Sequence, residues 1–114
     1  YYREHGLKYI VNVNMAILDE FLRRDRQIQS DLERIPKLGP KSIAKLKKRG
    51  FSTSFQLIAT LADRDFEWDL CLEFLRKNCA RGSIPSQILL ILLIKLEQTF
   101  DIPPPSEKWE RCFI

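Results

Sequence analysis

The run ILLILLI at residues 88–94 limits the folds open to this chain more than any other feature. It is far shorter than the roughly 20 apolar residues that a membrane-spanning helix needs, so we expect no membrane insertion. Leucine dominates the run and Pro85 suits the first turn of a helix, so we expect a helix over residues 85–100 rather than a buried strand. Such a helix is apolar on every side, and it needs cover from the rest of the chain or from a second subunit.

The segments before this run also have helical patterns. Apolar residues recur at intervals of three and four over residues 13–29, which predicts an amphipathic helix. Pro36 and Pro40 separate a short helix at 30–35 from a second one at 40–49, which stops at Gly50. The fold class that follows is all-α, a compact bundle of five to six short helices.

Two more helices are expected between Gly50 and the apolar run. Thr53 and Gln56 have the spacing of a capping box for a helix that reaches about Leu61. Asp63 or Asp65 can cap the next helix, and a left-handed Gly82 can close it. The apolar residues expected to be buried there are Phe66, Leu70, Phe74 and Leu75.

The length of 114 residues and the apolar content of 45% suit one domain with one core. We place a single helical domain at 13–101, an N-terminal extension with a faint strand-like alternation at 1–12, and a Pro-rich tail at 102–114. Trp109 and Phe113 are apolar enough to dock the tail on the domain, and they could equally fit a groove on another molecule.

The residues that usually carry chemistry are scarce. The three cysteines, Cys71, Cys79 and Cys112, have no CxxC spacing, and His5 is the only histidine. This pattern supports neither a disulfide framework nor a zinc site. Because few candidates exist for an acid, a base or a nucleophile, we expect a non-enzymatic protein without cofactor or metal.

Positive charge is concentrated in one segment. Residues 37–49 carry six lysines and arginines and no acid, so they hold a charge of +6 within a chain whose net charge is +4, and the remainder is −2. Such a basic segment is typical of proteins that bind a polyanion, although a solvated lysine-rich helix would look the same.

The sequence IPKLGPKSIAKL, at the start of this segment, looks like a helix-hairpin-helix element within residues 30–50. A glycine in the hairpin allows close approach to a phosphate, and the unpaired N–H groups at the start of the second helix favour an anion. We therefore expect binding to the backbone of double-stranded DNA without strong sequence preference. The candidate DNA-binding residues are Lys37, Leu38, Gly39, Lys41, Ser42, Lys45, Lys48 and Arg49.

From Leu38 to Phe100 the chain resembles the barrier-to-autointegration factor family, small dimeric DNA-binding proteins of animal chromatin. The resemblance lies in Leu38-Gly39, in Lys45-Leu46, in RGF at residues 49–51 and in EFLRKNC at residues 73–79, with Leu70, Leu93 and Phe100 beyond them. Lys37 stands where the family has its leading hairpin glycine, and Ala59 replaces another glycine.

The resemblance implies further properties. In the family the hairpin and the N-terminal segment contact DNA, the middle helices form a homodimer, and the dimer groove receives LEM-domain proteins of the nuclear envelope. By analogy we expect a nuclear protein whose dimer or partner interface contains Leu57, Ile58, Leu61 and Leu70.

Three functional hypotheses follow. The first is a nuclear module that binds double-stranded DNA and pairs with another copy of itself. The second is a diverged relative that has lost DNA binding and serves as a dimerisation or adaptor module for a chromatin or repair protein. The third is a helix-hairpin-helix accessory domain of a DNA-repair enzyme or polymerase.

Overall fold

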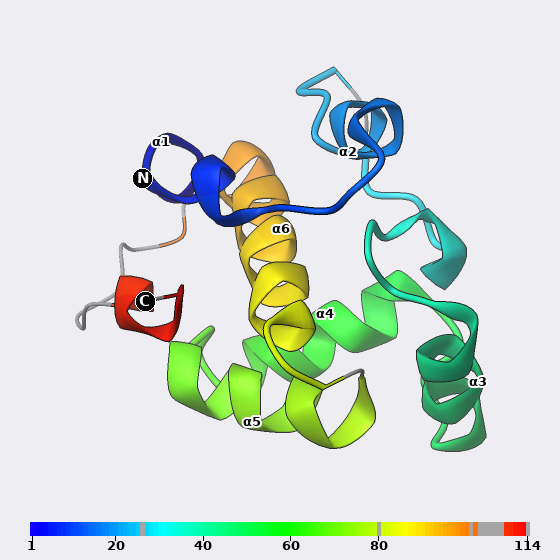
Figure 1. The fold of residues 1–114 in the computed structure, drawn as a ribbon. Coiled ribbons are helices and arrows are strands. Elements are labelled where there is room, and N and C mark those ends of the chain that lie inside the picture. The colour runs from blue at the N-terminus through cyan, green and yellow to red at the C-terminus, as the bar shows by residue number, and fades with distance from the viewer. Residues whose placement is uncertain (26, 80, 101, 103–108, 114) are drawn as a thin grey trace.

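Helix α6 (Ile84–Thr99) runs through the middle of the molecule, and the other elements are arranged around it (Figure 1). The computed structural model describes residues 1–25, 27–79, 81–100, 102 and 109–113. Within these residues there are six α-helices, and the only β-type pairing is an isolated bridge between Asp31 and Thr53. The radius of gyration is 12.9 Å. The expected compact all-α bundle is therefore confirmed.

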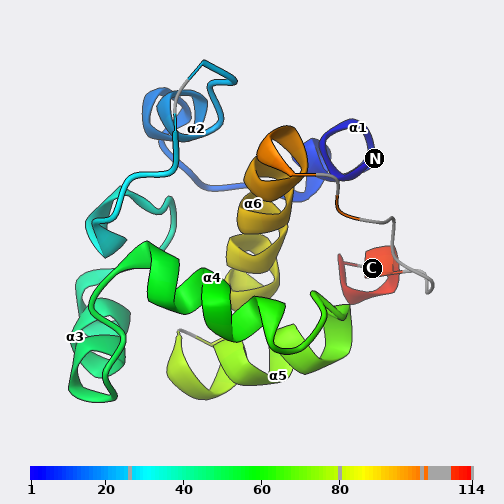
Figure 2. The ribbon, with the colours of Figure 1, turned by 180° about the vertical axis from the view of Figure 1, so that it is seen from behind.

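The apolar run at residues 88–94 is covered by the chain itself. Each of its side chains is no more than 1% exposed. Helices α1 (Tyr2–Gly6) and α5 (Trp68–Asn78) pack directly against α6, and α4 (Ser54–Ala62) lies beside the lower end of α6 when the molecule is seen from behind (Figure 2). The chain's own helices therefore bury the apolar run, and no second subunit is needed to cover it.

The N-terminal residues belong to the core, although their alternation suggests a strand and an extension. They form α1 and the 3-10 helix η1 (Leu7–Tyr9), and the side chains of Tyr2 and Ile10 are buried in the core cluster. Helix α1 approaches α6 so closely that a Cβ atom on Gly6 would lie 2.6 Å from Cδ1 of Leu90. The small size of Gly6 therefore allows this contact.

The C-terminal 3-10 helix η3 (Trp109–Phe113) docks beside the N-terminus, as Figure 1 shows. Trp109 is buried, and its ring centroid lies 5.7 Å from that of Tyr2 and 5.5 Å from that of Trp68. Phe113 stacks on Tyr9 with centroids 4.7 Å apart. The expectation that Trp109 and Phe113 dock on the same domain is confirmed. The prolines of the tail fall in residues 103–108, outside the described residues.

The first amphipathic helix is much shorter than the periodicity predicts. Helix α2 (Met15–Phe21) is capped by Asn14 and ends before residues 22–29, where we expected it to continue. Side chains donate hydrogen bonds to the backbone carbonyl groups that would accept from amides in a longer helix. Arg3 donates to the Leu22 carbonyl at 3.4 Å, and Lys95 donates to the Arg23 carbonyl at 2.6 Å.

The capping box at the start of α4 is confirmed, because Thr53 and Gln56 exchange both expected hydrogen bonds. Asp63 and Asp65 do not cap α5, which follows Glu67 without a side-chain cap. Gly82 adopts the expected left-handed conformation, with φ +75°, but the helix ends earlier, at Asn78.

The burial pattern expected around α5 is only partly correct. Leu75 is buried and Phe66 and Phe74 are partly buried, as expected. Leu70 is 44% exposed, so the prediction that it is buried was wrong.

Candidate nucleic-acid interface

The segment that resembles a helix-hairpin-helix consists of the 3-10 helix η2 (Leu32–Arg34), a turn over residues 35–39, and α3 (Pro40–Lys48). Pro40 stands in the first turn of α3, where a missing N–H costs nothing. Leu38, Ile43 and Leu46 are buried and fix the segment to the core. Leu38 can therefore offer DNA only its backbone.

The start of α3 has unsatisfied backbone donors. Gly39 is the N-cap and supplies no side-chain hydrogen bond. The amide of Ile43 is bonded to the Gly39 carbonyl at 3.0 Å, so the N–H groups of Lys41 and Ser42 precede the helix ladder. A Cβ atom on Gly39 would meet nothing within 4 Å, which shows that the surface here is open. These donors and the helix dipole favour an anion.

Three lysines share the outer side of α3. Lys41, Lys45 and Lys48 are spaced by four and three residues, which places them on one face of a helix, opposite Ile43 and Leu46. All three are exposed, and within the described residues none forms an ion pair or a side-chain hydrogen bond. We call Lys41, Lys45 and Lys48 the lysine face. It begins beside the open donors of Lys41 and Ser42.

Two other basic residues of the segment are engaged in contacts within the chain. Lys47 pairs with Glu33 at 3.1 Å, which ties α3 to η2. Arg49 donates to Oδ1 of Asn78 at 2.5 Å, at the end of α5. Arg49 is nevertheless exposed at the C-terminal end of α3, so it stays at the margin of the candidate interface.

Lys37 is placed differently from the phosphate contact that the sequence suggests. Its ammonium donates to the Val11 carbonyl at 2.7 Å and to Oε1 of Gln87 at 2.9 Å. Partial burial lowers the pKa of Lys37. Its backbone has φ +69°, a left-handed conformation that glycine adopts more easily. The charge is thus directed to the body of the protein, and the lysine face is a better candidate.

Cys79 lies near the lysine face but has no features of a reactive thiol. Burial raises the pKa of Cys79 to about 11, and the positive charge of Lys45 only partly opposes this shift. A thiol with such a pKa stays protonated at neutral pH.

Within the described residues no cluster of His, Cys, Asp and Glu could hold a metal ion. Among the described helices, none has the length and apolar character needed to cross a membrane.

The expected partner interface needs correction. Leu57 and Leu61 have no exposed surface, because both belong to the core of this chain. Ile58 is partly exposed and Leu70 is exposed, so these two remain accessible. The periodicity identifies α4 as apolar but does not say which apolar residues face inward.

The outer side of α4 presents an apolar surface of which the sequence analysis identified only Ile58. Phe55, Ile58, Ala59 and Ala62 have the spacing of one helix face, and Phe55 is 53% exposed. We call these four residues the α4 outer face. Helix α4 contains no charged residue, and this absence between Ser54 and Ala62 is the signal that could have indicated an exposed apolar side.

Comparisons with known proteins do not identify this chain. No protein-family model, no curated protein and no solved structure matches it. The resemblance to the barrier-to-autointegration factor family therefore stays a hypothesis that depends on the residues between Leu38 and Phe100.

Proposed function

We propose that this protein is a non-enzymatic module that binds the phosphate backbone of double-stranded DNA. The observation that carries the proposal is the lysine face, which has three exposed ammonium groups without partners in the described chain and starts at the open donors of α3. Phosphate oxygens accept from lysine side chains and from the N–H groups at a helix start.

The binding is proposed to be largely independent of DNA sequence. Contacts to phosphates fix the position of a protein on the duplex but do not distinguish one base pair from another. Lysines that neutralise phosphates release counterions, so the affinity falls as salt rises. With the lysine face and the open amides, we expect about three to five phosphates to be neutralised per chain.

The cellular role follows from the resemblance alone. We propose that the module acts in the nucleus, in chromatin or nuclear organisation, as a homodimer. A LEM-domain-like or chromatin protein is the kind of partner that the resemblance suggests.

A titration with labelled duplex DNA tests the proposal. Fluorescence anisotropy at low salt should show binding to several duplexes of unrelated sequence with affinities within a few-fold of one another. The variant Lys41→Ala/Lys45→Ala/Lys48→Ala should lose most of this binding and keep the wild-type melting temperature, because the three side chains are exposed. Absence of binding by the wild-type protein at low salt would contradict the proposal.

The second candidate function is a dimerisation or adaptor module that has lost DNA binding, and the α4 outer face supports its dimerisation part. A contiguous apolar surface that includes a half-exposed phenylalanine is a common feature of protein interfaces. We infer that a second copy of the chain covers this face, which agrees with the middle-helix dimer of the resembling family.

Light scattering at micromolar concentration tests the dimer, and absence of duplex binding in the titration above would favour this second function over the first. The wild-type protein should have twice the calculated chain mass of 13.5 kDa, and Phe55→Glu should be monomeric. Arg76→Glu, on α5, is the matched control and should stay dimeric, and Leu70→Glu tests whether the interface extends to α5. If the wild-type protein is a monomer, the α4 outer face is not a dimer interface.

A further inference from the structure

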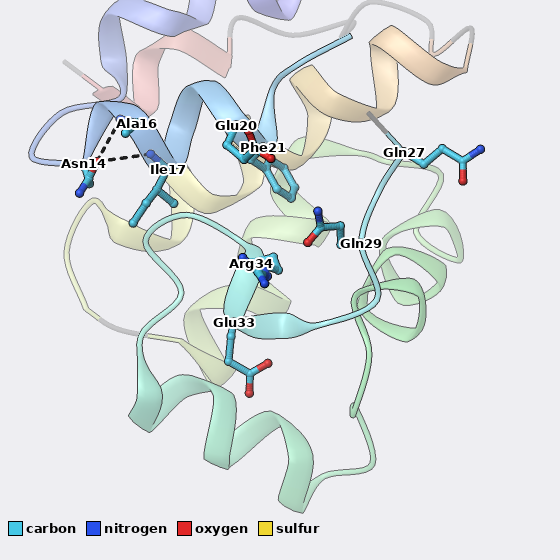
Figure 3. A pocket seen from close by; sticks show the side chains of 9 residues that line it. All are labelled: Asn14, Ala16, Ile17, Glu20, Phe21, Gln27, Gln29, Glu33 and Arg34. Atoms are coloured by element: carbon cyan, nitrogen blue, oxygen red, sulfur yellow. Dashed lines mark hydrogen bonds between the residues drawn. The ribbon is translucent and has the colours of Figure 1, made fainter. Parts of the chain in front are cut away.

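A hollow of about 420 Å³ lies between α2 and η2, and no residue of the lysine face lines it. Its apolar part comes from α2, where Ile17 is 51% exposed and Phe21 lies deeper. In Figure 3, Ile17 and Phe21 project from α2 toward Gln29 and Arg34. The volume is within the range of pockets that hold a ligand or an anchoring side chain.

The hollow continues on the other side of Ile17. A second hollow of about 230 Å³ is lined by Val13 and Pro36, and the two hollows share Asn14 and Ile17. Met15, at the start of α2, is also 59% exposed. Together they form an elongated groove along α2, which suits a segment of polypeptide better than a compact small molecule.

The charges around the groove decide what kind of segment fits. Glu33 lines the hollow, and its carboxylate is paired with Lys47 of α3 at 3.1 Å (Figure 3). Glu20 lies 3.8 Å from Arg23, whose guanidinium is also paired with Asp25 at 2.9 Å. Arg34 is exposed and, among the described residues, has neither an ion pair nor a side-chain hydrogen bond. Lys37 lines the second hollow, but its ammonium is bonded to Val11 and Gln87. Arg34 is thus the charged residue of the groove without such a contact in the described chain.

The polar groups beside Arg34 support the same chemistry. The side-chain oxygen of Asn14 is already engaged within the protein, because it accepts from the amides of Ala16 and Ile17 and so caps α2. The amide side chain of Gln29 lies next to Arg34 in Figure 3 and forms no hydrogen bond within the described residues. A guanidinium with an amide donor beside it is suited to bind a carboxylate.

We propose that this groove binds an acidic, amphipathic peptide segment of another protein. A bulky apolar side chain of the segment fills the hollow against Ile17 and Phe21, and a carboxylate about one helical turn away pairs with Arg34. The site is separate from the lysine face and from the α4 outer face, so it does not depend on DNA binding or on dimerisation.

A panel of labelled peptides of about twelve residues tests the inference. Each peptide carries a leucine, a phenylalanine or a methionine anchor with glutamates three and four residues away, and matched peptides carry lysines in place of the glutamates. In ¹H–¹⁵N NMR titrations, at least one acidic peptide should shift the resonances of Ile17, Phe21, Gln29 and Arg34, with a Kd on the order of 10–100 μM. The lysine peptides should not shift them.

Two variants identify the contacts. Ile17→Ala removes apolar area from an exposed helix position and should weaken the acidic peptide at least about fivefold. Arg34→Glu should weaken it at least about tenfold and should make the lysine version of the peptide bind. Arg76→Glu, which reverses a charge at an exposed site on α5, is the matched control and should leave the affinity unchanged.

The outcomes separate this inference from the proposed function. Lys45→Glu should leave the affinity for the peptide unchanged even though it reduces DNA binding. If no peptide of the panel shifts the groove at about 1 mM, or if Arg34→Glu has no effect, the inference is wrong. If duplex DNA shifts the same resonances instead, the groove is part of the DNA-binding surface and the inference is also overturned.

Discussion

Nζ of Lys37 lies 2.9 Å from Oε1 of Gln87, which connects the turn before α3 to the first turns of α6. The same Gln87 oxygen accepts from the amide of Val11 at 3.1 Å, and Lys37 also donates to the Val11 carbonyl. Three segments that are distant in the sequence meet at this point. Lys37 therefore positions the candidate DNA-binding hairpin without pointing its charge at DNA.

Lys37→Ala should reduce the stability of the protein. The substitution removes both hydrogen bonds of the ammonium, so we expect a loss of about 1–3 kcal/mol in the free energy of unfolding. Urea denaturation measures this loss, and Arg76→Ala, at an exposed site on α5, is the control. The salt dependence of DNA binding should change little. A shallower slope with unchanged stability would show that Lys37 contacts phosphate instead.

Gly39→Asp should change stability and DNA binding in opposite directions. The new carboxylate has room and can cap the amides at the start of α3, which should stabilise the fold by about 0.5 kcal/mol. The same carboxylate occupies the place proposed for a phosphate and repels it, so the affinity for duplex DNA should fall on the order of tenfold. Melting temperature and anisotropy are measured on the same sample. Unchanged affinity would remove the start of α3 from the interface.

Trp109→Ala should destabilise the protein more than any surface substitution. Trp109 is buried against Tyr2 and Trp68, so truncation leaves a large cavity and should cost about 3–5 kcal/mol. Phe100→Ala is the control, because Phe100 is 61% exposed and should cost little. Urea denaturation compares the two. Equal unfolding midpoints would mean that η3 does not contribute to the core.

Alkaline pH should weaken the fold through its buried thiols. Burial raises the pKa of Cys71 and Cys79 to about 11 in the folded protein, from an ordinary value of 9.0. The stability that their protonated forms contribute is complete below pH 9 and is lost as the pH rises toward about 11. Lys37 and Lys95 have the opposite effect on stability. Burial lowers the pKa of each ammonium, so their contribution to the stability of the fold increases as the pH rises.

The thiol contribution is measured as a difference between two proteins. The urea midpoint of the wild-type protein should fall more steeply over this pH range than that of Cys71→Ala/Cys79→Ala, in which only the lysines and other common groups titrate. Parallel curves would mean that the thiols do not contribute.

The sequence predicts well the features that depend on neighbouring residues. The capping box of Thr53 and Gln56 and the helix that begins near Pro85 were both found, because each signal lies within one turn of the chain. The end of α2 was not found. It depends on Lys95, which lies on α6 and binds the Arg23 carbonyl from 72 residues away.

The candidate site shows the same division. The sequence shows the basic segment and the N-cap glycine. It does not show which of the basic side chains contact other residues of the chain and which do not. Lys47 and Arg49 are engaged because Glu33 and Asn78 happen to lie beside them in the fold. Leu57 and Phe55 are both apolar residues of α4, and only the packing distinguishes the buried one from the exposed one.

The salt dependence of duplex binding tests the central claim, that the lysine face binds DNA phosphates, most directly. For the wild-type protein, log affinity should fall with log salt at a slope of about −3 to −5. Lys45→Ala should make the slope shallower by about one, whereas Arg76→Ala, an exposed site on α5 that changes the net charge equally, should leave it unchanged. Lys45→Glu should weaken binding to every duplex on the order of tenfold or more, with an unchanged melting temperature. An affinity and a slope that Lys45→Ala leaves at wild-type values would contradict the claim.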